Sequence, residues 1–174
     1  TTMTAIILAG GKATRMNGCD KAFLRINHKP VIKMQLSLLK KIFKQIIIVT
    51  NSPKEYRSLK GVKVIPDIIP HLGPLGGIFS GLLASQDKYN FVFACDMPFL
   101  NGALIKYLIS TKDNYDITIP KIDGKFQPLF SIYSKNCIPV IEEMLKQNRL
   151  SVSSIFTKVK SHFIKREVIE RFDT

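Results

Sequence analysis

The chain has 174 residues with an apolar fraction of 45%, which excludes disorder of the whole chain and favours one folded domain. Its 26 lysines and arginines outnumber 13 acidic residues, giving a net charge of +13. This excess favours an anionic partner, such as a nucleotide, a phosphorylated metabolite, nucleic acid or a lipid surface. The three cysteines form no C-x-x-C pair, so we expect neither a disulfide framework nor a zinc site, and a reducing cytoplasm. No apolar run approaches the roughly 20 residues of a membrane span, so no membrane partner is expected.

Short apolar runs alternate with segments of helical periodicity along the chain. Strands are expected at 4–9, 46–49, 62–66 and 91–94, with helices at 30–43 and 74–85. Further along, the patterns predict a helix at 102–109, strands at 116–120 and 128–133, a helix at 139–147 and a shorter helix from Ser151. Strands separated by helices indicate a parallel sheet with right-handed crossovers. We therefore predict an α/β fold of three layers, α/β/α, with a Rossmann-like, mostly parallel sheet.

Polar residues follow each of the first four predicted strands at the point where it ends. Gly10-Gly11 follows the first strand, and Asn51, Asp67 and Asp96 follow the next three. In open α/β sheets, ligands bind at the carboxyl ends of the strands. This placement is the strongest physical argument for a binding site.

The first of these turns has the composition of a phosphate-binding loop. Gly10 and Gly11 allow a tight turn with exposed amide hydrogens, and Lys12, Arg15 and Lys21 add positive charge. The spacing matches neither a Walker A loop nor a G-x-G-x-x-G fingerprint, and an ordinary turn with solvated lysines is the alternative. Residues 1–44 contain nine basic residues against one acidic residue, so small polyanions explain part of the net charge better than DNA or a membrane does.

Two aspartates are candidate ligands of a metal ion or nucleotide. Asp96 emerges from a fully apolar strand and could hold Mg²⁺ through one carboxylate while phosphates and water complete the coordination. The alternative for Asp96 is a polar end to a buried strand. Asp67 precedes the glycine-rich loop 73–77, whose following helix could face an anion. A turn or capping role is equally compatible with Asp67, and the glycines could serve helix-to-sheet packing.

The remaining reactive residue types form no recognisable constellation. His28, His71 and His162 stand in no metal-ligand spacing, and Cys95 is best explained as a small buried hydrophobic residue. The basic residues form no run interleaved with aromatic residues, and tryptophan is absent. We therefore expect no nucleic-acid partner.

Five segments together resemble the MobA-type nucleotidyltransferases, the molybdenum cofactor guanylyltransferases. The family pattern is Leu-Ala-Gly-Gly, Arg-Met, Asp-Lys, Gly-Pro-Leu-x-Gly and Cys-Asp-Met-Pro-Phe. In this chain it stands at Leu8–Gly11, Arg15-Met16, Asp20-Lys21, Gly73–Gly77 and Cys95–Phe99. Gln127-Pro128-Leu129 is similar to a further Pro-Leu element of the family, so the resemblance runs in order over about residues 3–133.

The resemblance implies one nucleotidyltransferase domain over residues 1–174, with the nucleotide bound by about 1–100 and the acceptor by about 101–174. It implies transfer of GMP from GTP to the phosphate of molybdenum-molybdopterin, with Mg²⁺ as cofactor. Molybdoenzyme apoproteins or other cofactor-biosynthesis proteins are further possible partners. The catalytic residues it implies are Lys21, Arg15 and Asp96, with Asp96 as the metal ligand. The nucleotide-binding residues it implies are Leu8, Ala9, Gly10, Gly11, Lys21, Asn51, Asp67 and Asp96.

Three other functions stay open at this point. A cytidylyltransferase acting on the same cofactor and a sugar-phosphate nucleotidyltransferase carry related motifs, although Leu-Ala-Gly-Gly is closer to the guanylyl type than Leu-Ala-Ala-Gly. A non-catalytic GTP-binding adaptor that delivers the cofactor is the third alternative. The family's usual Gly after Arg-Met is replaced by Asn17, and its Asn-x-Asn-Thr-Pro segment does not occur in these 174 residues. The sequence therefore identifies no acceptor-binding residues.

Overall fold

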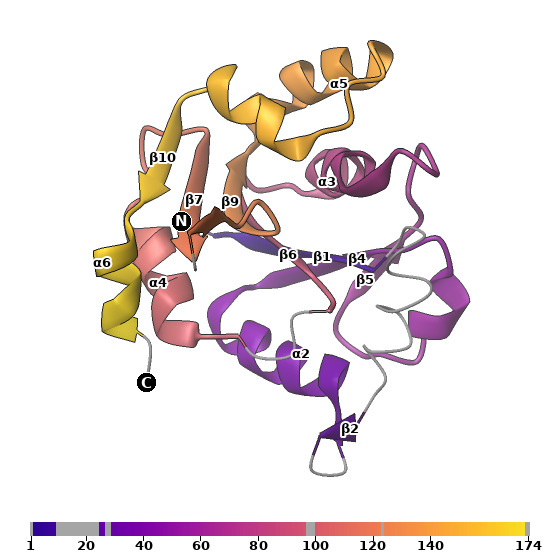
Figure 1. Ribbon diagram of the computed structural model, residues 1–174. Helices are drawn as coiled ribbons and strands as arrows, with labels where there is room; N and C mark the ends of the chain where they lie inside the picture. Colours follow the sequence, from indigo (N-terminus) through magenta and orange to yellow (C-terminus); the bar gives the residue numbers. More distant parts are fainter. Residues whose placement is uncertain (1, 10–24, 27–28, 97–99, 123, 173–174) are drawn as a thin grey trace.

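A mixed sheet of eight strands with helices on both faces forms the molecule (Figure 1). The computed structural model describes residues 2–9, 25–26, 29–96, 100–122 and 124–172. In chain order the elements, with η marking 3₁₀ helices, are β1 (Thr4–Leu8), β2 (Arg25–Ile26), β3 (Lys29–Pro30), α2 (Val31–Ile42), β4 (Gln45–Val49), η2 (Pro53–Tyr56), β5 (Lys63–Ile65), α3 (Gly73–Ala84), β6 (Tyr89–Ala94), α4 (Gly102–Ser110), β7 (Ile117–Ile122), β8 (Lys125–Phe126), β9 (Phe130–Ser134), η3 (Lys135–Cys137), α5 (Ile138–Lys146), η4 (Val152–Thr157), β10 (Ser161–Ile164), α6 (Arg166–Ile169) and η5 (Glu170–Phe172).

The direction of the strands brings most of their carboxyl ends to one edge of the sheet. The strand order is β10-β7-β9-β6-β1-β4-β5, with β8 paired to β7. The strands β6, β1, β4 and β5 are parallel, and β10 is parallel to β7. Because β9 is antiparallel to both β6 and β7, these two strands point the same way. We call the edge where β5, β4, β1, β6, β7 and β10 end the carboxyl edge.

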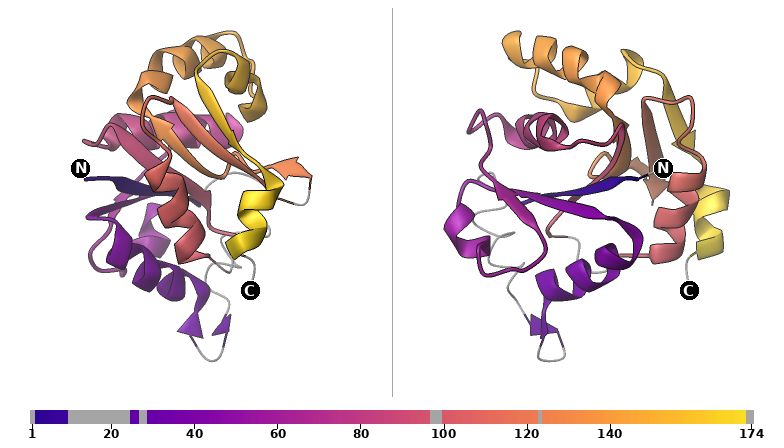
Figure 2. Two further views of the ribbon diagram at one scale, coloured as in Figure 1. Left: turned by 90° about the vertical axis from the view of Figure 1, so that its left-hand side faces the viewer. Right: turned by 180° about the vertical axis from the view of Figure 1, so that it is seen from behind.

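Each face of the sheet carries its own apolar core. Along β1, Ala5 and Ile7 belong to the core beneath α2 and α4, whereas Ile6 and Leu8 belong to the core beneath α3 and α5. Side chains alternate between the faces of a strand, so the apolar run at residues 5–8 of β1 is buried on both sides. The views from the side and from behind show helices on both faces of the sheet (Figure 2). Within the described part of the chain, no helix is long and apolar enough to cross a membrane.

Glycines bring α3 unusually close to the central strand. A Cβ atom placed on Gly81 would lie 2.5 Å from Cγ2 of Ile6, and one on Gly77 would lie 3.1 Å from Cδ2 of Leu8. Two glycines one helical turn apart therefore form the surface by which α3 contacts β1. The packing role that the sequence left open for the glycines of 73–77 applies to Gly77, and Gly81, which was not part of that prediction, has the same role.

The three-layer, mostly parallel fold predicted from the sequence is confirmed, with local differences. The strands near 116–120 and 128–133 are joined by a hairpin through β8, which makes β9 antiparallel. The strand β10 was not predicted, because its segment Ser161–Ile164 is short and only Ile164 is buried. Pro30 closes the short β3 and the helix begins at Val31, one residue later than expected.

Stability is expected to decrease above about pH 9 because the Cys137 thiol is buried. Burial, and secondly the carboxylate of Asp116, raise the pKa of Cys137 from 9.0 to about 12. In the unfolded chain the thiol loses its proton near its ordinary pKa, so alkaline conditions favour unfolding between the two values. Urea unfolding at several pH values is expected to give a shallower alkaline decrease for Cys137→Ser than for the unchanged chain. Equal slopes for both proteins would refute the raised pKa.

Candidate functional site

Backbone hydrogen bonds continue the parallel ladders beyond the ends of β1, β4 and β6. The Ala9 N–H donates to the carbonyl of Val49 at 2.8 Å, and the Cys95 N–H donates to the carbonyl of Leu8 at 3.0 Å. These bonds fix the chain where it leaves the central strand and where it approaches Asp96. The predicted residues Leu8, Ala9 and Asp96 are thereby brought together at the carboxyl edge.

Leu8 contributes to this edge through its backbone rather than its side chain. Its side chain is 6% exposed and packs in the core beneath α3, against Gly77. Its carbonyl is bonded to Cys95. A contact between Leu8 and a nucleotide would therefore use backbone atoms or the small exposed part of the side chain.

The turn that carries Asn51 is organised by its neighbour Thr50. Thr50 is fully buried, and its N–H donates to the carbonyl of Ile65 at 3.0 Å. Its hydroxyl oxygen accepts from the N–H of Ser52 at 3.0 Å and lies 3.5 Å from the carbonyl oxygen of Ala9. Asn51 is half-buried directly after this fixed point. Thr50 was missed in the sequence because a threonine ending a strand carries no distinctive pattern.

The carboxylate of Asp67 is held against α3. Its Oδ1 lies 3.0 Å from the hydroxyl of Ser80 and accepts from the N–H of Ile69 at 3.3 Å. Burial raises the pKa of Asp67 above its ordinary value of 3.8, and the hydrogen bond with Ser80 partly opposes that effect. The same hydroxyl accepts from the N–H of Ile68 at 2.9 Å. Asp67 therefore has a structural role in this loop, as the sequence allowed, and Ser80 is its unpredicted partner.

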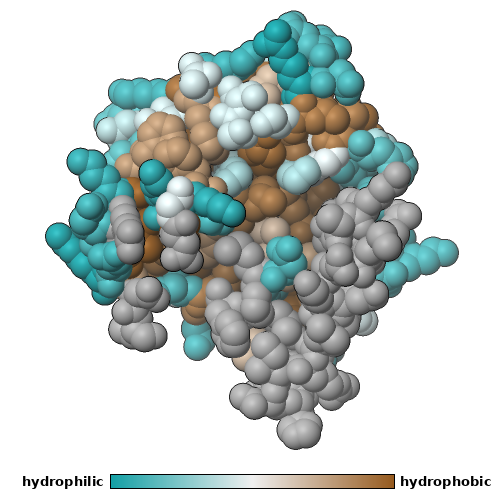
Figure 3. Space-filling view, in the orientation of Figure 1, coloured by the Kyte–Doolittle hydropathy of each residue, from teal (hydrophilic) through white to brown (hydrophobic). Residues whose placement is uncertain are grey.

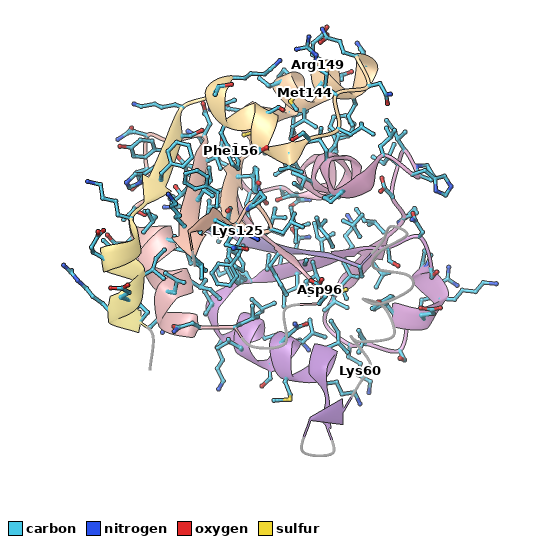
Figure 4. The ribbon with its side chains drawn as sticks, in the orientation of Figure 1. Lys60, Asp96, Lys125, Met144, Arg149 and Phe156 are labelled. Atoms are coloured by element: carbon cyan, nitrogen blue, oxygen red, sulfur yellow. The ribbon has the colours of Figure 1, made fainter. Side chains whose placement is uncertain are left out.

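Asp96 is an exposed carboxylate at this edge, where β6 ends. It follows the buried Cys95, whose carbonyl oxygen lies 3.5 Å from Nε2 of the buried Gln35 on α2. Figure 4 shows Asp96 where β6 ends, on the face toward the viewer. The described residues contain no group of three or more His, Cys, Asp or Glu side chains that could hold a metal ion. A single exposed carboxylate fits Mg²⁺, which is commonly bound by one or two carboxylates with phosphates and water.

Four predicted residues, Gly10, Gly11, Arg15 and Lys21, lie outside the described residues. Ala9 is the last described residue before this segment. It directly follows β1, and its N–H donates to the carbonyl of Val49 at the end of β4. The predicted phosphate-binding loop therefore starts in the middle of this edge. The roles of its four residues stay predictions.

Residues 127–129 also belong to the carboxyl edge, although they follow the antiparallel hairpin. The Ala94 N–H donates to the carbonyl of Leu129 at 3.2 Å, directly beside the end of β6. The Tyr133 hydroxyl donates to the carbonyl of Pro128 at 2.6 Å, and the Ser131 hydroxyl donates to the carbonyl of Gln127 at 2.5 Å. These two bonds from β9 hold the loop in place. The Pro-Leu element of the sequence thus adjoins the strand that leads to Asp96.

The sheet order and the two helical layers define an α/β fold of the nucleotide-diphospho-sugar transferase type. Residues 5–162 match the family model of the MobA-like NTP transferase domain, and the chain belongs to this family of nucleotidyltransferases.

Curated relatives share long stretches of sequence with the chain. A probable molybdenum cofactor guanylyltransferase of Clostridium perfringens (strain 13 / Type A) is 44% identical over 145 residues, covering 83% of this chain and 72% of the relative. The molybdenum cofactor guanylyltransferase of Desulfosudis oleivorans is 33% identical over 172 residues, covering 98% and 85%. The crystal structure of molybdopterin-guanine dinucleotide biosynthesis protein A from Archaeoglobus fulgidus has a TM-score of 0.79 at 23% identity, covering 98% of this chain and 87% of that one. This last comparison shows the shared fold.

Proposed function

We propose that the protein transfers GMP from GTP to the phosphate of molybdenum-molybdopterin, forming the guanine dinucleotide cofactor and releasing pyrophosphate. The observation that carries the proposal is the convergence of Ala9, Asn51, Asp67 and Asp96 at the carboxyl edge. The names of the relatives at 33–44% identity support guanylyl transfer rather than transfer of another nucleotide.

The reaction needs positioning and charge neutralisation more than it needs a general base. An oxygen of the acceptor phosphate attacks the α-phosphorus of GTP, and the bond from that phosphorus to the oxygen bridging to the β-phosphorus breaks. The electron pair of the broken bond leaves with pyrophosphate. The attacking phosphate is already anionic, so no proton must be removed from it. The protein's task is to align two polyanions and stabilise the charge that develops on the leaving group.

The residues divide this task according to their positions. Asp96 would hold Mg²⁺, which neutralises charge on the GTP phosphates. The Gly10-Gly11 amides, Arg15 and Lys21 would surround the phosphates from the loop that starts at Ala9. Asn51 and Asp67 line the next two strand ends, beyond the central strand.

A nucleotide panel measured by thermal unfolding tests the assignment. GTP with Mg²⁺ at about 100 times its Kd is expected to raise the Tm by about 5–10 °C, because a ligand that binds only the native state stabilises it. CTP and UTP at the same concentration are expected to give much smaller shifts. Stabilisation by CTP or UTP without stabilisation by GTP would contradict guanylyl transfer and favour the cytidylyl or sugar-phosphate alternatives.

Pyrophosphate release distinguishes the enzyme from the adaptor alternative. In the presence of GTP, Mg²⁺ and molybdenum-molybdopterin, the proposed function predicts pyrophosphate in proportion to the acceptor consumed. Binding of GTP without any release would identify a cofactor-delivery protein.

A further inference from the structure

Two phenylalanine rings are exposed together in the second half of the chain. Phe126 on β8 is 42% exposed and Phe163 on β10 is 41% exposed, with ring centroids 4.7 Å apart. Beneath them lies Phe156, only 8% exposed, with its ring centroid 6.2 Å from that of Phe126 and 5.9 Å from that of Phe163. We call these three residues the aromatic patch. Single exposed apolar side chains are ordinary on protein surfaces, whereas adjoining ones mark binding sites.

Phe126 brings one end of the aromatic patch to the carboxyl edge, where Asp96 lies. Phe126 pairs with Lys121 at the carboxyl end of β7, which points the same way as β6. The loop that follows β8 contacts β6 through the hydrogen bond between Ala94 and Leu129.

Lysines border the aromatic patch. Nζ of Lys121 lies 5.4 Å from the ring centroid of Phe126. Lys121 also lines a cavity of about 330 Å³ together with Gly124, Lys165 and Glu167. In the space-filling view, an apolar area crosses the upper middle of the face shown, with hydrophilic side chains above it and to its left (Figure 3). The cavity lining thus contains two lysines and one glutamate, an excess of one positive charge. An apolar surface beside this positive charge complements a ligand that is both planar and anionic.

We propose that the aromatic patch is the acceptor subsite, on which the planar ring system of the acceptor packs while Lys121 and Lys165 bind its anionic groups. This inference rests on the proposed function, because it assumes a second substrate at the carboxyl edge. Two exposed rings offer far less area than the roughly 800 Å² per partner of a stable protein interface. A small aromatic ligand therefore fits the patch better than a macromolecule does. Residues 101–174 would then contain acceptor-binding residues, none of which the sequence identified.

A fluorescence experiment tests binding without requiring turnover. The chain contains no tryptophan, so Phe126→Trp introduces a single reporter into the aromatic patch. Titration with a pterin monophosphate is expected to quench its emission saturably. The matched control is Leu83→Trp, because Leu83 is 44% exposed near the end of α3, at the opposite edge of the sheet. The emission of Leu83→Trp should decrease only because the pterin itself absorbs light. Equal decreases in both variants would overturn the inference.

A kinetic experiment tests the same residues with the natural acceptor. Phe126→Ala combined with Phe163→Ala is expected to raise the acceptor KM by about tenfold, because loss of a stacking contact with an aromatic ring weakens binding by about this factor. The KM for GTP is expected to stay unchanged. Phe126→Tyr keeps a ring and is expected to retain most of the affinity. An unchanged acceptor KM in the double variant would overturn the inference. Failure of the unchanged chain to release pyrophosphate would instead contradict the proposed function.

Discussion

Replacement of Asp96 by asparagine is expected to lower the turnover of GMP transfer by about two to three orders of magnitude. Asparagine keeps the size of the side chain but removes the negative charge that would bind Mg²⁺. Because Asp96 is exposed where the buried strand β6 ends, the Tm should stay within about 1–2 °C of the original. Turnover is measured as pyrophosphate release at saturating GTP over a series of Mg²⁺ concentrations.

Glu142→Gln is the matched control for Asp96→Asn. It also converts a carboxylate to an amide, but on α5, where the side chain is half exposed and 3.8 Å from Lys146. Its turnover should equal that of the unchanged chain, since exposed ion pairs of this kind contribute little. Near-normal turnover of Asp96→Asn at every Mg²⁺ concentration would remove Asp96 from the proposed metal site.

Gly81→Ala is expected to destabilise the fold by about 1–3 kcal/mol, although alanine is the better helix former by about 1 kcal/mol. The added methyl group would lie 2.5 Å from Cγ2 of Ile6, an atom of a branched side chain in the centre of the sheet. Ile6 is fully buried, and its branched side chain has little rotational freedom. We therefore expect α3 to move away from β1. Urea unfolding followed by circular dichroism measures the loss.

Gly77→Ala is the matched comparison for Gly81→Ala. Its methyl group would lie 3.1 Å from the terminal Cδ2 of Leu8, which can adjust by a small side-chain rotation. The gain in helix preference is expected to offset most of this strain, so the free energy of unfolding should change by less than about 1 kcal/mol. Equal losses for the two variants would show that the closeness of α3 to β1 is not what selects glycine at position 81.

Much of the architecture was predictable because the central strands carry apolar runs toward their carboxyl ends. Residues 5–8 of β1 and 91–94 of β6 are such runs, and burial on both faces of a sheet favours them. The antiparallel direction of β9 was not predictable, because it depends on a short hairpin whose second strand, β8, has only two residues. The edge strand β10 was missed for a related reason, since most of its side chains are not buried.

The candidate site was predictable only where a residue's position relative to a strand end determines its role. Asn51, Asp67 and Asp96 follow recognisable strands, and the parallel registers bring those strand ends together. The contact of Asp67 with Ser80 joins residues 13 positions apart through the path of a loop, which no local pattern encodes. Thr50 was missed for the same reason. Its hydrogen bonds to Ala9 and Ile65 form only when the sheet forms.

The insertion of β9 between β6 and β7 links the two halves of the carboxyl edge. Five residue pairs join β9 to β6, and two more join it to β7. The backbone near Asp96 and the backbone near the aromatic patch are thus joined by the hydrogen bonds of one sheet. The spacing between a bound nucleotide and its acceptor would then be set when the chain folds, so alignment of the two substrates would require no closing motion of one half over the other.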